Sequence, residues 1–198
     1  MVVTLASAAL VIPYLLFSPL AGRLAKIYKK RKIVVWAKFA EMLIMVVAAA
    51  GFLMHSTVLV LSSILLMGLQ SALFSPSKYG LIRDIGGEEG ISYGSGAMEM
   101  FAFVGILTGT LMAAFLSESV TIPVLCVILF GVALLGWLSS LTIRANESEP
   151  MKESHETLNP VKFVKDMFVR ALAFKGLNWV VVGLATFWFI GSMIQMVL

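Results

Sequence analysis

The sequence is poor in charged residues. Only 13% of its 198 residues are Asp, Glu, Lys or Arg, and 60% are hydrophobic. A soluble domain typically has about 25% charged and about 45–50% apolar residues. The composition therefore excludes an ordinary soluble domain and predicts a chain that is embedded in a lipid bilayer.

The residue types that most enzymes and metal sites need are also scarce. Cys126 is the only cysteine and lies in an apolar stretch, so no disulfide can form within the chain. His55 and His155 stand in polar segments without other metal ligands at a suitable spacing. The sequence has no G-x-S-x-G motif, no phosphate-binding P-loop and no His–acid pair of the acyltransferase kind. We therefore expect no enzyme activity, no metal and no cofactor.

Alternation of apolar and polar residues is missing from the hydrophobic stretches. Continuous apolar runs favour membrane-spanning helices over a barrel, because lipid requires every backbone polar group to be bonded internally. The fold class expected is all-α, a polytopic membrane helical bundle. Five of its helices occupy residues 1–143 and a sixth occupies 175–198. The expected helices are Val2–Gly22, Ile33–Met54, Val58–Pro76, Tyr93–Leu116, Val120–Ile143 and Lys175–Leu198.

Two polar segments separate these helices. Residues 77–92 are rich in glycine and carry charges of both signs. Residues 144–174 form a longer linker, whose first part is rich in Glu and Ser. Its second part, 160–174, has apolar residues at helical spacing with charged residues between them. That pattern is typical of an amphipathic helix on a membrane surface.

The basic segment Arg23–Lys32 organises the topology. It holds six Lys or Arg residues in ten positions, whereas the turns at 55–57 and 117–119 hold none. Short basic loops stay on the cytoplasmic side, and this segment and the linker therefore define that side. The net charge of +4 suits an anionic membrane surface, and no motif for nucleic acid is present. The first helix then begins outside with no basic flank, which predicts one more helix upstream.

A few polar side chains stand inside the apolar stretches. Lys38 and Glu41 are three positions apart and share one helix face. They either pair near the membrane interface, with Lys38 reaching to the surface, or line the inner mouth of a polar path. Gln70 is a lone polar residue deep in its helix, where it bonds either a polar ligand or another helix.

Glu99 has no basic residue within a turn of it in the sequence. Its partner must come from another helix, from water or from a substrate, unless it only favours a helix N-terminus. Lys78 and Tyr79 either contact a phosphate headgroup or anchor the helix at the interface. One ridge of small residues at every fourth position permits close helix packing, and it consists of Gly105, Gly109 and Ala113.

Several segments together resemble the major facilitator superfamily, and more closely its bacterial lysophospholipid transporter family. That family includes transporter portions fused to acylglycerophosphoethanolamine acyltransferase and acyl-ACP synthetase. The resemblance covers nearly the whole chain except Arg144–Asn159. The segments that carry it are GRLAKIYKKRK at 22–32, KFAE at 38–41, MGLQSALF at 67–74, PSKYG at 76–80, AMEM at 97–100, GILTGT at 105–110, NW at 178–179 and FWFIG at 187–191. The chain departs from the family pattern at Lys26, where the signature loop usually has Asp, and at Ser95, where Asn is usual.

The resemblance implies helices two to seven of a transporter of twelve helices, with substrate held between two halves. It implies transport of lysophospholipid across the bacterial cytoplasmic membrane, and an acyltransferase or acyl-ACP synthetase in the same chain or operon. Substrate-path residues would be Lys38, Glu41, Gln70 and Glu99, and the cytoplasmic gating loop would contain Arg23, Lys26, Lys29, Lys30 and Arg31. The alternatives are a proton-coupled exporter of a drug or metabolite, and a non-transporting membrane anchor for an acyltransferase.

Overall fold

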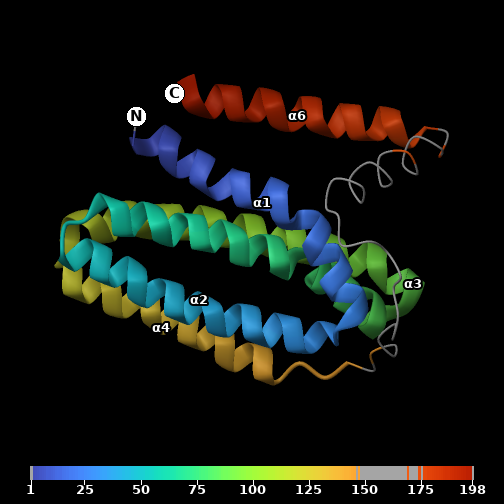
Figure 1. Ribbon diagram of the computed structural model, residues 1–198, viewed down its shortest axis with the longest axis horizontal. Helices are drawn as coiled ribbons and strands as arrows, with labels where there is room; N and C mark the ends of the chain where they lie inside the picture. The colour runs from blue at the N-terminus through green and yellow to red at the C-terminus, as the bar shows by residue number, and fades with distance from the viewer. Residues whose placement is uncertain (1, 146, 148–168, 170–173, 175, 198) are drawn as a thin grey trace. The chain divides into compact units, whose positions relative to one another are not determined.

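A computed structural model describes residues 2–145, 147, 169, 174 and 176–197. The chain forms two compact units, Met1–Ser154 and His155–Leu198. The first unit contains α1 (Val2–Ile27), α2 (Lys30–Leu53), α3 (Thr57–Ser119) and α4 (Ile122–Leu141), and the second contains α6 (Leu177–Val197) (Figure 1). The described residues are helical, as the composition predicts. The linker 144–174, where the sequence predicts an amphipathic helix at 160–174, lies almost entirely outside the described residues.

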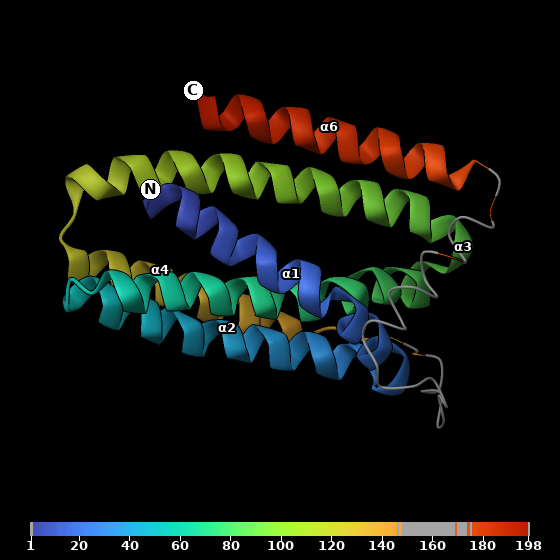
Figure 2. The same ribbon diagram turned by 45° about the horizontal axis from the view of Figure 1, so that its top comes forward.

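The helix α3 is too long for a single crossing. Its 63 residues correspond to about 95 Å of helix, whereas the bilayer core is about 30 Å thick. Gly87 breaks it, with φ 64° and ψ −161°, a conformation that only glycine adopts without strain. Figure 2 shows that the chain reverses its direction at this bend, so that the two halves of α3 run in opposite directions. Counting the halves separately, the described part of the chain has six helices.

The structure corrects three helix boundaries that the sequence predicts. The helix expected to stop at Pro76 continues to the break at Gly87, because proline inside a helix removes only one backbone donor. The helix expected to start at Tyr93 begins directly after that break. The basic segment Arg23–Lys32 is helical except at Tyr28 and Lys29, because Lys, Arg, Leu and Ala are good helix formers.

By length and composition, α1 to α4 can each cross a membrane. The apolar stretch of α6 is shorter in the described residues, Leu177–Met193. Side chains are sorted as lipid requires, with small residues inside and large apolar residues outside. Ala21, Ala72 and Ala133 are buried, whereas Trp36 and Phe115 are 69% and 71% exposed.

Packing in the first unit centres on the first half of α3. The helices α1 and α2 both pack against α3, and α4 packs against α2. Contact with α1 is close at Gly68, where an added Cβ would overlap the carbonyl oxygen of Leu10. The second half of α3 is different, since nearly every residue from Gly96 to Glu118 is exposed. The Lys38 region therefore lies between packed helices, and Glu99 does not.

Candidate functional site

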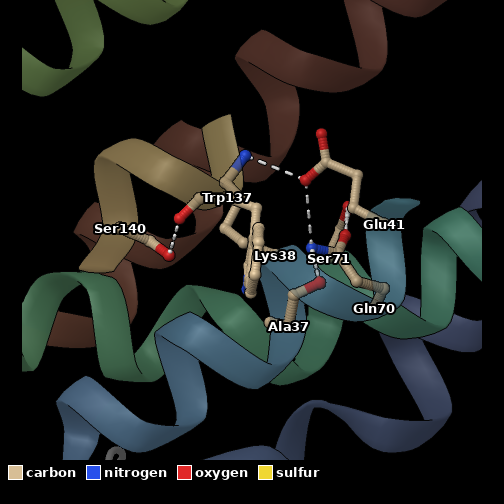
Figure 3. A network of polar contacts seen from close by, with 7 residues as sticks. All are labelled: Ala37, Lys38, Glu41, Gln70, Ser71, Trp137 and Ser140. Atoms are coloured by element: carbon tan, nitrogen blue, oxygen red, sulfur yellow. Dashed lines mark hydrogen bonds and ion pairs between the residues drawn. The ribbon is translucent and has the colours of Figure 1, made fainter. Parts of the chain in front are cut away.

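The polar residues of α2 form an ion pair. The Nζ of Lys38 lies 2.8 Å from Oε2 of Glu41, one helical turn further along α2 (Figure 3). Their side chains are 28% and 20% exposed, so the pair is partly withdrawn from the surface. The structure confirms the pairing that the spacing predicts.

Gln70 joins this pair from α3. Its Nε2 donates to the carbonyl oxygen of Ala37 at 3.2 Å and to Oε2 of Glu41 at 3.5 Å. Gln70 is buried, at 7% exposure, and the hydroxyl of Ser71 donates to its Oε1 at 3.4 Å. The glutamine therefore bonds another helix, which is one of the two roles expected for it. Lys38, Glu41, Gln70 and Ser71, which we call the α2–α3 polar network, thus place an ammonium, a carboxylate and an amide together.

Aromatic rings and a glycine surround Lys38. Its Nζ lies 5.5 Å from the centroid of the Phe74 ring, a distance at which a cation and a ring attract each other. On the side of α4, a Cβ added at Gly136 would lie 3.7 Å from this Nζ. The ring centroids of Phe39 on α2 and Trp137 on α4 are 5.9 Å apart. The ammonium therefore has an aromatic ring and a glycine beside it in addition to the Glu41 carboxylate.

Glu99 finds its partner within α3. The hydroxyl of Tyr79, in the first half of α3, donates a hydrogen bond to the carboxylate of Glu99 in the second half. The Nζ of Lys78 lies 4.7 Å from the centroid of the Tyr79 ring. Glu99 is exposed, and among the described residues no hydrogen bond or ion pair connects it to the α2–α3 polar network. The candidate residues therefore lie at two separate places. Lys38, Glu41 and Gln70 belong to the α2–α3 polar network, whereas Glu99 lies with Tyr79.

The basic segment is tied to two other helices. The Nζ of Lys30 lies 2.5 Å from a carboxylate oxygen of Asp84, whose side chain is only 6% exposed. The guanidinium of Arg31 donates to the carbonyl oxygen of Leu141 at 3.0 Å, at the end of α4. The backbone N–H of Arg31 donates to the carboxylate of Glu147 at 3.1 Å. The segment therefore connects the start of α2 to the bend of α3 and to the end of α4, at one end of the first unit.

The other basic residues of the segment are placed differently. Lys26 and Lys29 are exposed and make no ion pair with any described residue. The Nε of Arg23 is buried and has no hydrogen-bond partner among the described residues. Asp84 is the functional candidate that the sequence analysis missed. The available signal was an acidic residue in the segment 77–92, on the same predicted side as six basic residues.

The small-residue ridge has no neighbour in the described structure. No described atom lies within 4 Å of a Cβ added at Gly105 or Gly109. Its packing role stays a prediction. No group of three His, Cys, Asp or Glu residues suited to a metal occurs in the described ranges.

Comparison with known proteins gives a family match over the whole chain. The family model of the Major Facilitator Superfamily matches residues 1–198. The lysophospholipid transporter LplT of Photorhabdus laumondii is 27% identical over 130 residues, which are 63% of this chain and 30% of that protein. The protein of the same name from Pectobacterium carotovorum is 26% identical over 160 residues, 78% of this chain and 36% of that protein. The chain spans about a third of the length of these relatives. No solved structure matches.

Proposed function

The chain belongs to the major facilitator superfamily, and we propose that it forms part of a transporter for lysophospholipids in the bacterial cytoplasmic membrane. Two curated relatives that carry this function in their names support the substrate class. In this proposal residues 1–143 belong to the N-terminal half and residues 175–198 begin the second half. The linker 144–174 lies in the cytoplasm, and an acyltransferase or acyl-ACP synthetase of the same chain or operon uses the transported lipid.

The α2–α3 polar network carries the proposal. A lysophospholipid has an anionic phosphate beside one acyl chain, so its path needs a cation within an apolar wall. Lys38 supplies that cation, with Phe74 and Gly136 beside it. Glu41 holds the ammonium in position, and Gln70 donates to the same Glu41 oxygen. In this proposal the polar groups of the headgroup bind beside this pair. Partial exposure of Lys38 and Glu41 leaves one side of the pair open to a ligand.

Substitution of Glu41 tests this assignment. Glu41→Gln keeps the shape and an acceptor for Gln70 but removes the charge that holds Lys38. A partly exposed ion pair contributes up to about 1 kcal/mol, so we expect lysophospholipid uptake to fall about fivefold. Uptake is measured with radiolabelled lysophosphatidylethanolamine in cells that express the complete natural protein. Glu118→Gln, at an exposed position in the last turn of α3, is the matched control and should leave uptake unchanged.

Topology gives an independent test of the membrane assignment. In a Cys126→Ser background, single cysteines at His55 and Glu118 should react with an impermeant thiol reagent added outside. Cysteines at Lys29 and Arg144 should react only after the cells are opened. The asymmetry of basic residues and the contacts of Lys30 and Arg31 motivate this result. The opposite labelling pattern would contradict both the orientation and the proposed cytoplasmic linker.

Proton-coupled export of a drug or metabolite is the second candidate. The observation that favours it is the bond from the Tyr79 hydroxyl to Glu99, because the partner of this exposed carboxylate is a neutral hydroxyl and not a basic side chain. Absence of lysophospholipid uptake by the complete natural protein, together with proton-driven export of another solute that Glu99→Gln abolishes, would favour this candidate over the first.

A further inference from the structure

A groove of about 710 Å³ lies between the end of α1, the first half of α2 and the first half of α3. Its walls are mostly leucine, isoleucine and alanine, with Trp36 at the side. Its polar lining residues are Tyr28, Lys32 and Gln70. Lys38 and Glu41 do not line it, so most of this surface lies outside the α2–α3 polar network.

The groove has the length of one membrane leaflet. On α2 it runs from Lys32 to Ile44, which is about 18 Å at 1.5 Å per residue. The hydrocarbon core of a bilayer is about 30 Å thick, so one leaflet accounts for about 15 Å. An acyl chain whose headgroup lies at the basic segment would therefore end near Ile44, at the other end of the groove.

Charge is concentrated at the mouth of the groove. Lys32 lines it, and the neighbouring Lys29 is exposed, and neither makes an ion pair with a described residue. Lys30 and Arg31, in contrast, are bound to Asp84 and Leu141. The mouth thus offers the Lys32 ammonium and the Tyr28 hydroxyl beside an apolar channel, and the exposed Lys29 follows Tyr28 in the sequence.

We propose that this groove holds one acyl chain of a resident anionic phospholipid, from the leaflet next to the basic segment. The phosphate lies against Lys32 and Tyr28, and the chain runs along Trp36 and Leu43. A neutral protein helix would fill the apolar walls but would leave the ammonium groups without an anion. This lipid is distinct from the transported substrate, so the inference does not depend on the proposed function.

Fluorescence quenching by brominated lipids tests the proposal directly. The whole chain is reconstituted in vesicles that contain brominated phosphatidylglycerol or brominated phosphatidylcholine. The contribution of Trp36 is the difference between the unchanged chain and Trp36→Phe. We expect half of this contribution to be quenched at a mole fraction of brominated phosphatidylglycerol about fivefold lower than that of brominated phosphatidylcholine. The reason is that each basic residue near the surface attracts anionic lipid. Lys32→Gln should remove most of this preference.

Two variants separate the groove from general surface charge. Lys26→Gln removes an exposed charge that does not line the groove, and it should keep the preference. Ala40→Phe fills the apolar wall without changing charge, and it should abolish the preference even if Lys32 is intact. Equal quenching by both lipids, or equal effects of Lys26→Gln and Lys32→Gln, would overturn the proposal. Displacement of the brominated lipid by excess lysophosphatidylglycerol would also overturn it, because the groove would then hold the substrate.

Discussion

Reversing either charge of the Lys30–Asp84 pair is expected to destabilise the first unit strongly. Lys30→Asp would place two carboxylates together beside a side chain that is only 6% exposed, and Asp84→Lys would place two ammonium groups there. Breaking a buried ion pair typically costs about 3–5 kcal/mol. Because the Lys30 side chain is 22% exposed, we expect a loss near the lower end, about 3 kcal/mol.

The only cysteine of the chain provides the measurement. Cys126 is buried in α4, at 8% exposure, and becomes reactive toward a fluorogenic maleimide when the helices separate. Each single reversal should lower the temperature at which Cys126 reacts. The double variant Lys30→Asp with Asp84→Lys restores opposite charges. Its Cys126 reaction temperature should return most of the way to that of the unchanged chain. Lys26→Asp, at an exposed position without an ion pair among the described residues, is the control for a change of net charge.

Recovery in the double variant is the decisive result. If both single variants destabilise the chain and the double variant does not recover, the positions matter for packing and their ion pair does not. If neither single variant changes the temperature, Asp84 is not buried against Lys30 in the membrane. The pair also connects the basic segment to the part of α3 just before its break at Gly87.

The overall fold follows from composition, but the helix boundaries do not. Long apolar runs and alternating basic turns are sufficient to predict an all-helical membrane bundle, whereas its family is indicated by the segments that resemble the major facilitator superfamily. Pro76 predicts a helix end, but its single missing donor leaves the rest of the helix intact. The real break is Gly87, one of several glycines in its segment, and the sequence does not show which of them has φ above zero.

The candidate site was predictable where its contacts are local. The spacing of Lys38 and Glu41 on one helix is sufficient to pair them. The bond between Gln70 and Ala37 joins residues 33 positions apart, and the Lys30–Asp84 pair joins residues 54 positions apart. Such contacts depend on how helices cross, which the apolar pattern of one sequence does not specify. For the same reason the sequence does not distinguish Gly68, which lies close to α1, from Gly105, which has no neighbour among the described residues.

Substitution of Glu99 is expected to have the largest effect on transport. Glu99→Gln should keep insertion and abundance, because the carboxylate is exposed and its replacement keeps nearly the same shape. If Glu99 binds a substrate ammonium or a proton during transport, losing that charged contact costs about 1.4 kcal/mol or more. We therefore expect lysophospholipid uptake by the complete natural protein to fall tenfold or more. Glu99→Asp should recover part of the uptake if charge matters more than reach.

Tyr79 separates a transport role of Glu99 from a structural one. Tyr79→Phe removes the hydroxyl that bonds Glu99 and keeps the ring beside Lys78. If the bond only fastens the two halves of α3, Tyr79→Phe and Glu99→Gln should lower uptake and the Cys126 reaction temperature alike. If Glu99 acts on the substrate, Glu99→Gln should lower uptake far more than Tyr79→Phe, with the reaction temperature unchanged. Glu118→Gln should be neutral in both assays. Full uptake by Glu99→Gln at normal abundance would remove Glu99 from the transport path and leave Lys38 and Glu41 as its charged residues.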